Sequence, residues 1–133
     1  MGVAISLTLA GCSSAGSHPP VSTTPGSAAS ASSSTVPPNV LLGIAAAERA
    51  CMNLGDAITK QHDGASAGDI GTAMTAANGS ARAAAEQDVR WSAFANDVGA
   101  ISGGAATAAG TARVGTICTR LSQDASYFTT HSP

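Results

Sequence analysis

From position 40 onwards, apolar side chains recur at alternating spacings of three and four residues, which is typical of one face of an α-helix. The first predicted helix follows Pro37 and Pro38, has Asn39 as its N-cap, and ends near Asp63 and Gly64. Its apolar stripe comprises Val40, Ile44, Ala47, Cys51, Leu54 and Ile58. This is the clearest periodicity in the chain, so the folded part is expected to begin here.

The second predicted helix starts at Ser66, and Asp69 three residues later completes a near-capping box. Its stripe is built mainly of small side chains: Ile70, Ala73, Met74, Ala77, Ala81 and Ala84. Asn78 and Gly79 lie in its middle, and glycine inside a helix is about 1 kcal/mol less favourable than alanine. The sequence therefore allows either one continuous helix or a break at this point.

A third helix is expected after Asp88 as N-cap, and it carries the bulkiest core candidates: Trp91, Phe94, Val98 and Ile101. Gly103 and Gly104 are expected to end it. A fourth helix is expected to begin between Thr107 and Thr111. Its stripe comprises Val114, Cys118, Leu121, Ala125 and Phe128. Because Trp91 opens a regular stripe, we interpret it as a core residue and not as a ligand contact.

These four segments predict an all-α fold, a small up-down helical bundle of about four helices over residues 39–128, with a frayed tail at 129–133. Residues 13–38 consist almost entirely of Ser, Thr, Ala, Gly and Pro and carry no charged side chain. Such a segment buries too little apolar surface to offset the entropy of ordering it, so we expect a disordered linker. Its hydroxyl groups are possible sites of O-glycosylation.

The start of the chain suggests where the protein resides. A short apolar run ends in Leu9, Ala10, Gly11 and Cys12, a tetrapeptide that resembles the lipobox of bacterial lipoproteins at all four positions. The resemblance implies that residues 1–11 are a signal peptide and that Cys12 is lipidated and becomes the new N-terminus. No Lys or Arg precedes Cys12, so the basic front end of a signal peptide is missing. The alternative is a chance apolar start with a buried or disulfide-bonded Cys12.

The layout of the whole chain resembles that of small cell-envelope lipoproteins of mycobacteria and related actinobacteria. The shared features are a lipobox, a Ser/Thr/Pro linker, and an Ala-rich helical domain with one cysteine in its first helix and one in its last. The resemblance implies an extracytoplasmic protein, lipid-anchored to the cell membrane, whose linker over 12–38 is a tether. Treated as a flexible coil, this tether spans roughly 25–30 Å on average. The resemblance implies no catalytic residues.

Cys51 and Cys118 both lie on apolar stripes, which permits a disulfide across the bundle. If Cys12 carries a lipid, these two cysteines form an even pair in an oxidising compartment, where a bridge is the expected state. Metal binding and redox chemistry are the alternatives. Neither cysteine has a second cysteine or a histidine at ligand spacing, so we expect no metal site and no cofactor.

Composition narrows the partners. Six basic and eight acidic side chains give a net charge of −2, and no basic stripe is present for contacts with nucleic-acid phosphates. No apolar run is long enough to cross a bilayer, so the lipid is the expected membrane attachment. Two acyl chains would hold the protein firmly.

Catalytic motifs are also missing: the sequence has no Gly-x-Ser-x-Gly, no phosphate-binding loop and no His-Glu-x-x-His. Its carboxylates are explained as helix caps, solvated groups or helical ion pairs with Lys and Arg, including Arg82–Glu86 and Arg120–Asp124. An enzyme is therefore the least expected function.

The expected function is a structural or protein-interaction module that binds another envelope protein, because this fits the tether and the lack of catalytic motifs. The alternative is a carrier or sensor of a small apolar ligand, lipid or haem, held between helices. The carrier hypothesis predicts a cavity lined by the small side chains of the second predicted helix.

Overall fold

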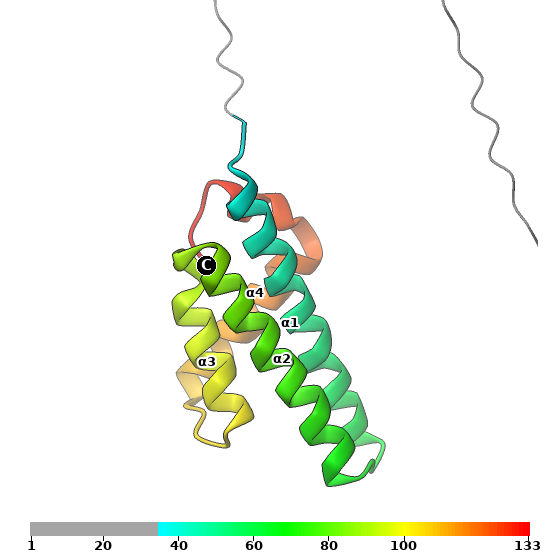
Figure 1. Cartoon of the computed structure of the whole chain (residues 1–133). Helices are drawn as coiled ribbons and strands as arrows, with labels where there is room; N and C mark the ends of the chain where they lie inside the picture. The colour runs from blue at the N-terminus through cyan, green and yellow to red at the C-terminus, as the bar shows by residue number, and fades with distance from the viewer. Residues whose placement is uncertain (1–34) are drawn as a thin grey trace, which may run out of the picture. The chain divides into compact units, whose positions relative to one another are not determined.

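The computed structural model describes residues 35–133. They form four packed α-helices and two short 3-10 turns, so the predicted all-α bundle is confirmed (Figure 1). The elements in chain order are α1 (Pro38–His62), α2 (Ala67–Gln87), η1 (Val89–Trp91), α3 (Ser92–Ser102), α4 (Ala108–Asp124) and η2 (Ala125–Thr129). The predicted signal peptide, the lipobox and nearly all of the predicted linker lie outside the described residues.

The longest helices, α1 and α2, form a hairpin whose contact surface is rich in alanine. Ala47 and Ala50 of α1 have no exposed surface, and the same is true of Ala77 and Ala81 of α2. Small side chains let two helices approach closely along their length. The helix α2 is continuous through Asn78 and Gly79, so the break that the sequence allowed does not occur.

The predicted start of the second helix is confirmed, and that of the first is wrong. The Ser66 hydroxyl accepts a hydrogen bond from the Asp69 N–H at 3.2 Å, as the near-capping box predicts. The N-cap of α1, however, is Pro37 and not Asn39. Pro38 occupies the first turn, where its fixed φ angle favours helix and its missing N–H is not needed. Asn39 therefore lies inside α1, and its side-chain amide donates to the Gln87 carbonyl of α2 at 3.3 Å.

Asp88 is the N-cap of the 3-10 turn η1 and not, as predicted, of the third α-helix. Its carboxylate accepts a hydrogen bond from the Arg90 N–H at 3.1 Å and thereby starts η1, after which α3 begins at Ser92. At the other end of the bundle, Thr107 caps α4 through a 3.0 Å hydrogen bond from the Gly110 N–H. This start falls within the predicted interval.

The bulky core residues gather around the indole ring of Trp91, which is fully buried. Its ring centroid lies 5.6 Å from that of Phe94 and 5.2 Å from that of Phe128. Gly43 of α1 packs against the indole Nε1 edge of Trp91. A Cβ atom at position 43 would lie only 3.1 Å from Trp91 Nε1, so a larger residue would be crowded there. The prediction that Trp91 is a core residue is confirmed, and the cluster joins α1, η1, α3 and η2.

The end of the predicted fourth helix differs from expectation. The helix α4 ends at Asp124, and η2 carries the last part of the predicted stripe, with Phe128 buried. Within residues 35–133, neither of the predicted ion pairs Arg82–Glu86 and Arg120–Asp124 forms, whereas Asp56–Lys60 does, at 2.6 Å. The guanidinium of Arg120 instead lies 4.8 Å from the centroid of the Tyr127 ring.

Candidate apolar ligand cleft

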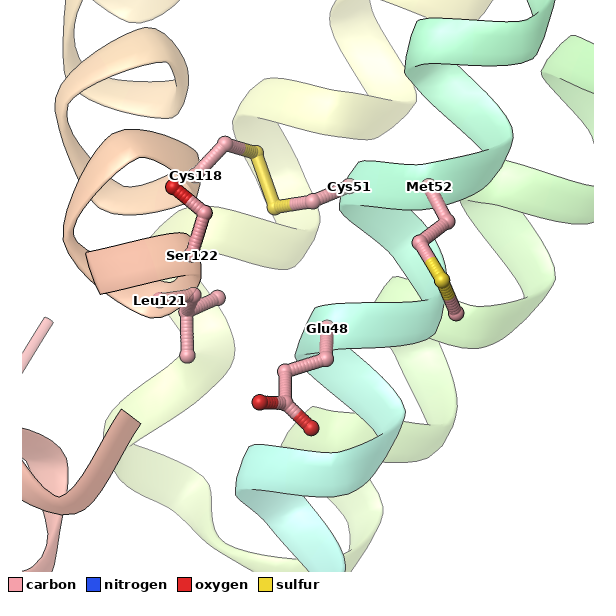
Figure 2. A pocket seen from close by; sticks show the side chains of 6 residues that line it. All are labelled: Glu48, Cys51, Met52, Cys118, Leu121 and Ser122. Carbon is pink, nitrogen blue, oxygen red and sulfur yellow. A yellow bond between two sulfur atoms is a disulfide. The ribbon is translucent and has the colours of Figure 1, made fainter. Parts of the chain in front are cut away.

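The disulfide Cys51–Cys118 joins α1 to α4, which confirms the predicted pairing (Figure 2). The two Cα atoms are 5.5 Å apart, well within the usual range for a disulfide. Elsewhere α1 and α4 touch at few positions, because α1 packs mainly on α2, and α4 on α3 and η2. The contact between α1 and α4 is therefore open on both sides of the bridge.

The first opening, which we name the apolar cleft, lies between the disulfide, the C-terminal half of α1 and the N-terminal half of α4. Its volume is about 390 Å³, and all four helices contribute to it. The residues that line it are Cys51, Leu54, Gly55, Ala57, Ile58, Gln61, Ile70, Met74, Ile101, Thr111, Val114, Gly115 and Cys118. Among the described residues none of these carries a charge, and the polar ones, Gln61 and Thr111, are exposed and lie at the end of the cleft where α1 ends and α4 begins.

The second opening, which we name the Glu48 groove, lies on the other side of the disulfide and has a volume of about 510 Å³. It is lined by Glu48, Cys51, Met52, Cys118, Leu121 and Ser122 (Figure 2). This groove differs from the apolar cleft because it contains a carboxylate and a serine hydroxyl. The disulfide belongs to the walls of both openings.

Large apolar side chains around the cleft are incompletely covered by the fold. Ile58 is 65% exposed although it belongs to the predicted apolar stripe of α1. Ile70, Met74 and Ile101 are only half-buried, and all of them face the same cleft. The reason is that α4 diverges from the part of α1 that follows Cys51, so α4 does not cover the apolar stripe of α1 as far as Ile58. The result is a concentration of apolar surface that a ligand could remove from water.

None of the charged side chains of the described region lines this cleft. The Arg90 guanidinium binds the nearly buried Asp88 carboxylate at 2.6 Å, and this hydrogen bonding lowers the pKa of Asp88 and raises that of Arg90, against the opposing effect of desolvation. Arg113 binds Asp97 at 2.8 Å, and this hydrogen bond raises the pKa of Arg113. Arg90 also donates to the Phe128 carbonyl at 3.4 Å. Arg90, held by Asp88, therefore links η1 to η2, and the Asp97–Arg113 pair links α3 to α4.

The histidines of the described region lie far from each other in sequence and outside both openings. His62 has an 88% exposed side chain at the end of α1, and His131 stacks on Tyr127 with ring centroids 4.0 Å apart. Within residues 35–133 no group of three His, Cys, Asp or Glu side chains is arranged to hold a metal ion. Over the same range no helix is long and apolar enough to cross a membrane.

The structure brings together Cys51 and Cys118 as predicted, while Leu9, Ala10, Gly11 and Cys12 lie outside the described residues. The predicted location of a cavity, along the small side chains of the second helix, is wrong. The α2 alanines pack against α1, and α2 contributes Ile70 and Met74 to the cleft instead. Sequence reasoning also missed Gly55 and Gly115. Their positions one helical turn from each cysteine could have indicated space beside the bridge.

Comparisons with protein-family models, with curated proteins and with solved structures gave no match for this chain.

Proposed function

We propose that this protein is a lipid-anchored protein of the cell envelope whose helical domain binds a single-chain amphiphile in the apolar cleft, as a carrier or sensor. One observation carries the proposal: all four helices line a cleft of about 390 Å³ without a charged side chain among its described residues. That volume lies within the range of small-molecule sites, which are typically apolar with a few polar groups. The lipobox at Leu9–Cys12 supports the anchor.

The lining favours an acyl chain over haem. Haem iron is held in proteins by an axial ligand such as histidine, cysteine thiolate or methionine. Of the described lining residues only Met74 offers such a group, because both cysteines are oxidised to the disulfide. An acyl chain needs only apolar walls. Gln61 and Thr111, exposed at one end of the cleft, provide hydrogen-bonding groups for an uncharged head, such as that of a monoacylglycerol.

Binding is tested with N-phenyl-1-naphthylamine, an uncharged probe whose fluorescence rises in apolar sites. The variant Ile58→Lys replaces an apolar side chain of the cleft wall and is expected to weaken probe binding about tenfold, because it removes apolar surface that a bound probe would cover. Ile58 is already 65% exposed, so the fold should tolerate the change.

The matched control is Met52→Lys, the same kind of substitution on the same helix at a residue that is 66% exposed and lines the Glu48 groove. Its affinity for the probe should equal that of the unmodified domain. Failure of the unmodified domain to bind the probe would refute the proposal, and so would equal affinities of the Ile58→Lys variant and its control.

The anchor is tested separately by intact mass of the membrane-extracted protein. We expect loss of residues 1–11 and added mass from a lipid on Cys12. Reduction should add the mass of two hydrogens, because Cys51 and Cys118 are disulfide-bonded. An unprocessed species that begins at Met1 would contradict the proposed anchor without bearing on the cleft.

A second candidate function is a module that binds another envelope protein. It is favoured by three large apolar side chains exposed on α1: Leu41 (50%), Leu42 (55%) and Met52 (66%). The Met52→Lys variant distinguishes the two functions. It should impair binding of a protein to this face of α1 and leave probe binding in the cleft intact.

A further inference from the structure

We propose that the Cys51–Cys118 disulfide is the end wall of the apolar cleft and thereby sets the length of acyl chain that the cleft accepts. This inference rests on the proposed ligand-binding function and names its specificity determinant. It predicts that a ligand lies with its polar head at Gln61 and Thr111 and with its terminal methyl group against the two sulfur atoms.

The disulfide lies between the two openings, because both of its cysteines line each of them. Glu48 precedes Cys51 in α1 and Leu121 follows Cys118 in α4, and both line the Glu48 groove. In contrast, the cleft is lined by α1 residues that follow Cys51 and by α4 residues that precede Cys118. The bridge therefore stands between α1 and α4 with one opening on each side of it.

Two glycines leave open space about one helical turn from the bridge. Gly55 follows Cys51 by one turn of α1, and Gly115 precedes Cys118 by about one turn of α4. A Cβ atom built on either glycine would meet no other atom within 4 Å. Both glycines line the cleft, so their missing side chains leave room for the end of a ligand directly in front of the disulfide.

The length of the cleft follows from the helix that forms its wall. Gln61 lies ten residues after Cys51 in α1, which corresponds to about 15 Å along the helix axis. Carbon–carbon bonds are about 1.5 Å long and zigzag in an extended chain, so this distance holds on the order of ten to twelve carbons. A longer chain would have to pass the bridge and would reach the opening that contains the Glu48 carboxylate.

The experiment measures displacement of N-phenyl-1-naphthylamine by monoacylglycerols of increasing chain length. For the unmodified domain, affinity should rise about threefold to fourfold with each added methylene until the chain reaches the bridge, and then stop rising. Gly115→Leu and Gly55→Leu fill the space in front of the bridge, so the rise should stop at a shorter chain. The double variant Cys51→Ala/Cys118→Ala removes the wall, so the rise should continue to longer chains.

Gly79→Leu is the matched control, because Gly79 lies in α2, has no atom within 4 Å of a built Cβ and does not line the cleft. It should leave the chain-length limit unchanged. If the cysteine variant does not fold, as judged by circular dichroism, the two glycine variants decide the question. An unchanged limit in the glycine variants would overturn the end-wall inference while the proposed function stands. If no monoacylglycerol binds the unmodified domain, the proposed function itself fails.

Discussion

Replacement of Trp91 by alanine is expected to lower the free energy of unfolding by about 3–5 kcal/mol. The indole ring is fully buried and packs edge-on against Phe94 and at a tilt against Phe128, so its removal leaves a cavity where α1, η1, α3 and η2 meet. Aromatic pairs of this geometry contribute beyond the area they bury. Urea denaturation followed by far-ultraviolet circular dichroism measures the change.

Trp91→Phe is the comparison variant. Trp91 Nε1 is buried without a hydrogen-bond partner among the described residues, so phenylalanine gives up ring volume and no polar interaction. It should therefore destabilise the domain clearly less than alanine does. A loss below about 1 kcal/mol for Trp91→Ala, which is the size of an average substitution, would show that this cluster is not the principal core.

Removal of the disulfide in the Cys51→Ala/Cys118→Ala variant is expected to destabilise the domain by about 4 kcal/mol. The bridge closes a loop with a sequence separation of 67, and the chain-entropy model gives this magnitude for a loop of that length. For a domain of about this size the melting temperature should fall by roughly 15–30 °C. Thermal unfolding monitored by circular dichroism, with and without a reductant, provides the measurement.

The variant supplies its own control, because a reductant should lower the melting temperature of the unmodified domain and leave that of the variant unchanged. Amide hydrogen exchange should localise the effect. Without the bridge, α4 has few contacts with α1, so the α4 amides should lose protection before those of the α1–α2 hairpin. Equal melting temperatures before and after reduction would contradict the expected stabilisation.

The sequence predicts this fold well where local chemistry and helical periodicity agree. Ser66 provides a cap that needs only Asp69 three residues later, and the stripe that starts at Trp91 needs only the regular spacing of large side chains. The start of α1 was predicted wrongly because Pro38 competes with Asn39 for the role of starting the helix, and proline in the first turn prevailed. The preference of Asn for the N-cap and the preference of Pro for the first turn are of comparable strength, so the sequence alone does not indicate which of the two sets the start of the helix.

The cleft could not be predicted for a different reason. Periodicity shows which side chains face the interior, but it contains no information on how far apart two facing stripes lie. Ile58 has the spacing of a core residue and is nevertheless 65% exposed, because its partner helix diverges. The disulfide was predictable since it depends on two residues, whereas the space beside it depends on the packing angle of four helices.

The alanine contact between α1 and α2 has a mechanical consequence. Alanine has no side-chain rotamers, so the two helices lock together without loss of side-chain entropy and without side chains that can rearrange. The side chains with several rotamers, such as Met74 and Ile101, lie instead around the cleft. The hairpin of α1 and α2 thus acts as a stiff support. Any adjustment to ligands of different width should come from displacement of α4 against it, with the disulfide as the pivot.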